Sequence, residues 1–383
     1  MPTTKDVTRA IHLTGGKLQH MLQANGQFQY RFHIRSDVRY KPKYNMLRHA
    51  GSVYALGQYH DFGHEPELVS NIRDAVQFMK SCCVKSLPDQ DATVLWMLRT
   101  KDTQDDDFQQ AAKLGGAGLG LVAAVTAVNK KQPVFSTSEL AGLGNFILFM
   151  QKADGSFYSK YFEDTATRDE KWTSLYYPGE AALGLLFLNG VVPDTKWLMG
   201  AKKALLYLAR SRKGKSNVPA DHWALIATQR LLNDVPELTD TTRRMLVAHA
   251  VQISEEILSQ QQKDSHSRAY GAFDRYGKTT PAATRIEGLV AAYKLLPDSQ
   301  KKLKKRIYQA VEKGVAFLLK TQIKKGPHAG AIPRALLTMP KEGFDAKKFN
   351  QRRREVRIDY LQHALCAMIG WLEIQEISTS EKK

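Results

Sequence analysis

The sequence is poor in cysteine and has none in the spacing of a metal site. Its three cysteines are Cys82, Cys83 and Cys366, and there is no CxxC pair. Adjacent cysteines rarely bridge each other, so neither a disulfide framework nor a thiolate zinc site is expected. The low cysteine content favours a reducing compartment.

Long apolar runs are also missing. No stretch approaches the roughly 18 apolar residues of a membrane span, and the first residues lack the charged, apolar and small-residue order of a signal peptide. We therefore expect no transmembrane segment. The expected location is the cytoplasm, or outside the cell without a visible signal peptide.

The sequence has fewer acidic than basic residues. It contains 38 Asp and Glu and 56 Lys and Arg, which gives a net charge of +18. The excess predicts attraction to an acidic polymer or peripheral contact with an anionic surface, with a solvated basic surface as the plain alternative. No helix-turn-helix, RNA-recognition or finger signature accompanies the charge, so sequence-specific nucleic-acid binding is not expected. Nothing in the sequence indicates an oligomeric state.

Two segments suggest cofactor chemistry at first sight. The glycines of residues 115–120 match neither the phosphate loop nor the dinucleotide fingerprint. Glycine inside a helix costs about 1 kcal/mol relative to alanine, so close helix packing or space for a ligand must compensate. The three aspartates of residues 105–107 are interpreted as a solvated loop. We expect no cofactor and no metal.

Six stretches share one pattern, in which a short polar or ring-bearing opening is followed by about ten small and apolar residues. They are residues 44–56, 113–125, 175–187, 218–228, 280–293 and 355–371. Each stretch predicts a buried helix with one solvent-exposed end. Amphipathic stretches lie between them, so the repeat is a helical hairpin plus a connector, on the order of 60 residues long.

Residues 26–34 alternate apolar and polar side chains, which predicts a strand or hairpin arm, with residues 93–98 as its candidate partner. We therefore expect one domain over residues 1–383. An N-terminal β-hairpin extension should occupy about residues 1–40 of it.

Six hairpins with a buried inner ring resemble the six-hairpin toroid, or (α/α)6 barrel, of many glycosidases, polysaccharide lyases, sugar epimerases and terpene cyclases. The turn at residues 151–157 is similar to the glutamine-to-aromatic turns of terpene-cyclase toroids. The strings at residues 47–51, 177–180, 221–223, 285–289 and 357–363 resemble a poorly characterised bacterial branch of this fold. The resemblance covers nearly the whole chain and implies an all-α (α/α)6 barrel. It implies a reaction only weakly, because the fold carries unrelated chemistries.

Two families that share this fold have motifs that the sequence lacks. A lanthionine cyclase needs a cysteine and histidine zinc set on its inner helices, and only Cys366 falls on one. A squalene-type cyclase needs an Asp-x-Asp-Asp motif, which is absent.

The polar openings of the inner helices are the candidate site. Parallel inner helices would gather their N-termini on one face, where unpaired amides favour anions. The candidate catalytic residues are Asp221, His222, Glu287, Asp359, Glu180 and His363, and the candidate substrate-binding residues are Arg48, His49, Tyr177, Trp223, Arg285, Arg357 and Tyr360. The plain alternatives are helix capping for Glu180 and Asp221, mutual pairing for Arg285 with Glu287 and for Arg357 with Asp359, and a core position for His363.

Two reactions fit this set of residues. Glycoside hydrolysis needs two carboxylates across a cleft. Proton abstraction beside a uronate carboxylate, as in a lyase or epimerase, needs a cation and a histidine or tyrosine base. The arginines favour an acidic glycan or uronate-containing saccharide as substrate. The alternatives are a non-catalytic toroid that binds an anionic ligand or glycan, and a terpene or peptide cyclase-like toroid.

Overall fold

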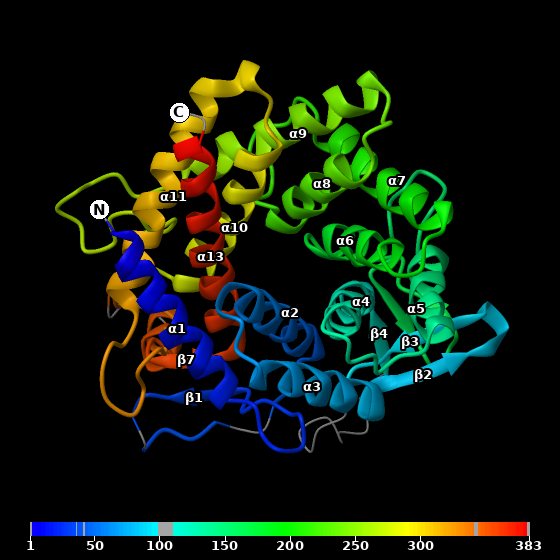
Figure 1. Cartoon of the computed structure of the whole chain (residues 1–383), viewed down its shortest axis with the longest axis horizontal. Helices are drawn as coiled ribbons and strands as arrows, with labels where there is room; N and C mark the ends of the chain where they lie inside the picture. Colours follow the sequence, from blue (N-terminus) through cyan, green and yellow to red (C-terminus); the bar gives the residue numbers. More distant parts are fainter. Residues whose placement is uncertain (1, 36, 41–42, 99–109, 341–343, 381–383) are drawn as a thin grey trace.

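Six helices form a closed inner ring in which each packs against the next (Figure 1). They are α2 (Met46–Gly63), α4 (Leu114–Asn129), α6 (Tyr177–Asn189), α8 (His222–Asp234), α10 (Thr279–Leu295) and α13 (Ile358–Ser380). The structure is a computed structural model that describes residues 2–35, 37–40, 43–98, 110–340 and 344–380. The predicted (α/α)6 barrel is confirmed, and each predicted inner stretch overlaps the N-terminal part of one of these helices.

Helix α4 has no polar face because protein surrounds it. In α4, every residue from Leu114 to Ala127 is buried. A Cβ atom on Gly118 would overlap the backbone of Glu180, and a Cβ atom on Gly184 would overlap the backbone of Gly118. The glycines therefore let α4 and α6 approach backbone to backbone, which offsets their cost in a helix.

Six further helices surround the ring (Figure 1). They are α1 (Thr4–His20), α3 (Glu67–Cys83), α5 (Thr137–Phe149), α7 (Thr195–Arg212), α9 (Asp240–Ser259) and α11 (Lys301–Thr321). Their apolar faces pack inward, as in α11, where Leu303, Ile307, Val311 and Leu318 are buried.

Helix α1 corrects the hairpin expected within about residues 1–40. A capping box formed by Thr3 and Asp6 starts the helix. Val7, Ile11 and Leu18 recur at helical spacing and are buried. The helix packs against α13 and α2, so the N-terminal segment supplies the outer helix beside the last inner one.

The strands are short and lie in the connectors. They are β1 (Arg31–His33), β2 (Val84–Leu87), β3 (Ala92–Leu95), β4 (Ala111–Lys113), β5 (Lys160–Phe162), β6 (Thr167–Arg168) and β7 (Glu355–Arg357). The predicted pairing of residues 26–34 with residues 93–98 is wrong, because β1 pairs antiparallel with β7 while β3 pairs with β2. The β1 pairing joins the N-terminal segment to the chain just before α13.

A short helix, α12 (Phe344–Gln351), precedes β7, and 3-10 turns occupy Pro88–Gln90 and Asp298–Gln300. None of the described helices is both long and apolar enough to cross a membrane. The aspartates of residues 105–107 lie outside the described residues.

Candidate functional site

The N-terminal ends of the six inner helices surround one cavity of about 460 Å³. This volume is within the range of small-molecule sites. One lining residue from each helix in turn is Arg48, Leu119, Glu180, His222, Arg285 and His363. The inner-helix openings therefore meet at a single place.

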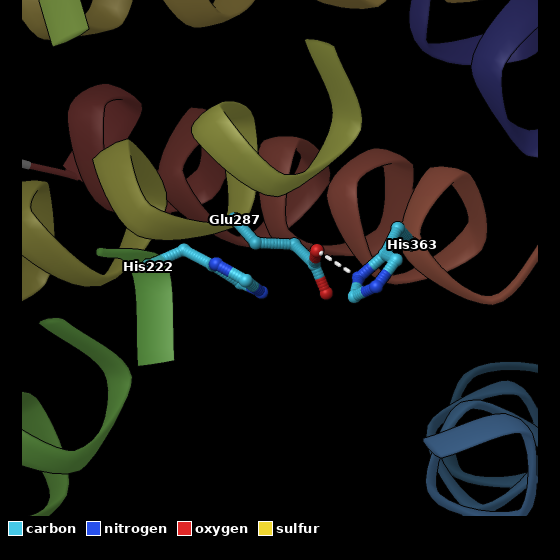
Figure 2. A group of neighbouring side chains, drawn as sticks. All are labelled: His222, Glu287 and His363. Carbon is cyan, nitrogen blue, oxygen red and sulfur yellow. Dashed lines mark hydrogen bonds and ion pairs between the residues drawn. The ribbon is translucent and has the colours of Figure 1, made fainter. Parts of the chain in front are cut away.

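Two histidines and a glutamate form a buried cluster beside this cavity. Figure 2 shows the Glu287 carboxyl group between the rings of His222 and His363, each residue coming from a different inner helix. The Nδ1 atom of His363 lies 2.7 Å from Oε2 of Glu287, whereas both ring nitrogens of His222 are buried without a hydrogen-bond partner. The two imidazole centroids are 5.4 Å apart.

The pKa values of the two imidazoles are shifted in opposite directions. Burial, then the charges of His363 and Arg285, lowers the pKa of His222 well below its usual value. Burial alone would also lower the pKa of His363, but the charge and hydrogen bond of Glu287 outweigh it and raise that pKa. A neutral imidazole thus faces one that favours its charged form, the arrangement expected of a base and an acid.

Glu180 in the first turn of α6 is a second unpaired group. Its side chain is buried, and its Oε2 atom has no hydrogen-bond partner. Burial, reinforced by Asp221 and opposed by Arg48, raises its pKa to about 8. At neutral pH this carboxyl group is therefore protonated and can donate a hydrogen bond to a ligand.

Asp359 is fully engaged by arginines, as the mutual-pairing alternative expects. Arg357 donates to both carboxylate oxygens at 2.5 and 2.8 Å, and Arg48 Nε donates to Oδ2 at 3.1 Å. Burial would raise the pKa of Asp359, but Arg357 and then Arg48 lower it. Asp359 is thus an anion that neutralises and orients two lining arginines, while Tyr30 accepts a hydrogen bond from Arg48 at 2.8 Å.

Asp221 and His49 do not line the cavity. Asp221 is fully buried, accepts from the Ala224 amide at 3.1 Å and pairs with Arg212 at 2.8 Å, so it caps α8. His49 is hydrogen-bonded to the Tyr44 hydroxyl and the Ala75 carbonyl group, both at 2.8 Å. Burial lowers the pKa of His49 to about 4.

The remaining expected residues lie close to the cavity. Tyr177, Trp223 and Tyr360 line it, although the Tyr360 hydroxyl donates to buried Glu355 at 2.7 Å. Glu287 reaches the cavity through its contact with His363.

Two lining cations, Lys278 and Arg334, are not among the residues expected from the sequence. They come together because the Thr279 amide donates to the Arg334 carbonyl group at 3.0 Å, and Lys278 forms a β-bridge with Ala335. No sequence pattern marks a contact between these two segments. With Arg48, Arg285 and Arg357, they make five cationic side chains around the cavity.

The His222, Glu287 and His363 cluster is also the group that could hold a metal ion within the described part of the chain. Its ligand atoms all lie within 4.8 Å of one another, and two histidines with a carboxylate are a known ligand set. The five cationic side chains around the cavity oppose a doubly charged cation. The arrangement therefore suits proton transfer better than metal binding.

A larger cavity of about 960 Å³ opens toward the C-terminal ends of α2 and α13. Its described lining includes Asp61, Glu373 and Glu376 but no histidine, arginine or lysine. It therefore lacks the acid-base pair and the cations of the N-terminal cavity.

Comparisons with known proteins show a shared fold. No family model and no curated protein sequence matches this chain. Among solved structures, it is similar to a D-mannose isomerase, with a TM-score of 0.68 and 12% identity over 96% of this chain and 97% of that one. A sugar epimerase from a ruminal bacterium gives a TM-score of 0.67 and 11% identity, covering 96% and 98% of the two chains.

An unsaturated glucuronyl hydrolase specific for heparin gives a TM-score of 0.62 and 12% identity, covering 98% of this chain and 99% of that one. At these identities the likeness is one of fold, and it spans nearly the full length of each chain.

Proposed function

We propose that this protein is a carbohydrate-active enzyme that moves a proton on an acidic saccharide, as an epimerase, isomerase or lyase does. The observation that carries the proposal is the imidazole of His222, buried without a hydrogen-bond partner, beside the His363–Glu287 pair. The arginines around the same cavity favour an anionic substrate. Three proteins of the same fold whose names refer to sugars support a saccharide ligand.

The proposed roles follow from the protonation states. Neutral His222 accepts the proton from a carbon beside a carbonyl or carboxyl group, where the resulting negative charge is delocalised. His363, whose pKa Glu287 raises, donates a proton to the oxygen on which that charge develops. Arg48 and Arg357, oriented by Asp359, stabilise the anionic substrate.

Hydrogen exchange tests this proposal directly. The protein is incubated in D2O with neutral sugars, uronates and uronate oligosaccharides, and deuterium entry at carbon is followed by NMR. Replacing His222 with Gln should reduce the exchange rate by about 10²- to 10⁴-fold, the usual contribution of a general base. His266→Gln is the matched control because His266 is exposed. Exchange at the wild-type rate in the His222 variant would remove this residue from the mechanism.

The pH profile gives a second check. His222 must be neutral to accept a proton and its pKa is lowered, so activity should persist into mildly acidic solution. His363 must be charged to donate and its pKa is raised, so the alkaline limb should lie above the ordinary imidazole value of about 6.5. An activity optimum narrowly centred at pH 6.5 would contradict the two opposite shifts.

Glycoside hydrolysis is the second candidate, and the protonated carboxyl group of Glu180 in the cavity favours it. Hydrolysis also needs a second, free carboxylate, and Asp221 and Asp359 are both paired with arginines. Release of reducing ends without carbon-bound deuterium would favour hydrolysis. In that case Glu180→Gln should abolish turnover. Saccharide binding without either product would indicate a non-catalytic binder.

A further inference from the structure

We infer that the start of α10, together with Lys278, Arg285 and Arg334, is a binding subsite for the phosphate group of a sugar phosphate. This inference deepens the proposed function, on which it rests for the sugar itself. It assigns the anionic group of the substrate to one side of the cavity and its chemical class to a phosphate monoester.

The lining cations fall into two groups. Arg48 and Arg357 share the carboxylate of Asp359, so their charge is partly compensated. Within the described residues, Lys278, Arg285 and Arg334 form no ion pair with a carboxylate. All three line the same cavity. These three cations at the start of α10 thus have no carboxylate of the described residues in direct contact, although Asp274, which accepts from the Lys278 backbone amide at 3.1 Å, lies nearby.

Neutral neighbours hold these three cations in place. Arg285 donates from Nε to the side-chain oxygen of Gln260 at 2.8 Å and from Nη1 to the Pro281 carbonyl group at 3.2 Å. The Arg334 guanidinium lies 4.9 Å and the Lys278 ammonium 5.9 Å from the centroid of the Phe349 ring. Their charges are thus positioned without being neutralised, which favours an anion from outside the chain.

The helix start adds polar groups of its own. Lys278 at the N-cap of α10 makes no side-chain capping bond, and the first turn carries no acidic residue. The Oγ1 atom of Thr280 is buried without a hydrogen-bond partner, and Thr280 and Thr284 both line the cavity. The hydroxyl group of Thr280 is therefore an unpaired polar group beside the cations, whereas the Thr279 amide is already bonded to the Arg334 carbonyl group.

The charge balance favours phosphate over carboxylate. A carboxylate carries one negative charge and would leave two of the three cations uncompensated. A phosphate monoester carries about 1.5 to 2 negative charges near pH 7 and has three oxygens for arginine forks. His222 and His363 line the same cavity as these three cations. A sugar whose phosphate group binds here would therefore have carbon atoms near the acid-base pair.

Calorimetric titration of the full chain at fixed ionic strength tests the subsite. The probes are inorganic phosphate, glucose 6-phosphate, glucuronate and glucose. We expect glucose 6-phosphate to bind more tightly than glucuronate or glucose. Arg334→Gln should weaken binding of inorganic phosphate and glucose 6-phosphate by at least tenfold. Lys302→Gln removes an equal charge from the exposed face of α11 and should leave the affinity for both phosphates unchanged.

Three results would overturn the inference: no phosphate binding, equal affinity in the Arg334 and Lys302 variants, or tighter binding of glucuronate than of glucose 6-phosphate. If Arg334→Gln fails to fold, as judged by circular dichroism, Lys278→Met serves in its place. Because binding needs no turnover, the two proposals fail separately. Deuterium exchange on unphosphorylated sugars without phosphate binding refutes only the subsite, whereas phosphate binding without exchange, with sugar phosphates added to the exchange panel, refutes only the reaction.

Discussion

Replacing Glu180 with Gln should stabilise the protein, and increasingly so as the pH rises. Glutamine has the shape of the protonated acid but cannot ionise. Burial raises the pKa of Glu180 from its ordinary value of 4.5 to about 8. The unfolded chain therefore releases this proton near pH 4.5, while the folded protein keeps it until about pH 8. Between these values the unfolded state binds fewer protons, so rising pH favours unfolding.

The magnitude follows from the size of the shift. Each pKa unit corresponds to about 1.4 kcal/mol. The loss of unfolding free energy caused by Glu180 should therefore grow from near zero below pH 4.5 to about 3 kcal/mol at pH 7. It should level off near 5 kcal/mol above pH 8. The glutamine variant escapes this cost because its side chain stays neutral at every pH.

The free energy of unfolding, measured by urea denaturation at pH 5, 6, 7, 8 and 9, checks this reasoning. The difference between Glu180→Gln and the wild type should be small at pH 5 and widen by about 1.4 kcal/mol per pH unit up to pH 8. Glu237→Gln is the matched control, because Glu237 is exposed. A difference that does not change with pH would show that Glu180 ionises normally in the folded protein.

Three further substitutions probe other parts of the fold. Ile11 in α1 is fully buried, so Ile11→Ala should lower the unfolding free energy by about 2–5 kcal/mol; a change below 0.5 kcal/mol in denaturation would mean that α1 is a loose appendage. Arg357→Gln should cost about 3–5 kcal/mol by leaving Asp359 poorly compensated, and thermal unfolding should show partial recovery when Asp359→Asn is added. Gly115→Ala would push a Cβ atom into the buried carboxyl group of Glu180 and lower the unfolding free energy by about 1–3 kcal/mol. A Cβ atom at Gly116 would have its nearest neighbour at 3.5 Å, so Gly116→Ala should be neutral or slightly stabilising in thermal unfolding.

The inner ring could be predicted from the sequence because its signal is local. A helix surrounded by protein needs small and apolar residues on every side, and the six stretches with this composition recur along the chain. The order of the hairpins along the chain also predicts that the polar N-terminal ends of these helices lie together. Hairpins of similar length bring alternate helices into parallel orientation. The structure places Arg48, Glu180, His222, Arg285 and His363 around one cavity, while their chemical roles stay predictions.

Other features of the site depend on which distant segments meet. Arg48 and Asp359 are 311 positions apart, so no local pattern identifies their pairing. The same holds for Arg334 beside the start of α10.

The helical ring and the polar groups at the N-terminal ends of its helices were thus predictable, because hydrophobic periodicity is a local property of the chain. Tertiary contacts set which of those groups are paired with an opposite charge, and they make the N-terminal segment an outer helix. Ion pairing and burial depend on neighbours that ring closure brings together from opposite ends of the chain. The protonation states of Glu180, His222 and His363, on which the proposed chemistry rests, follow from those neighbours.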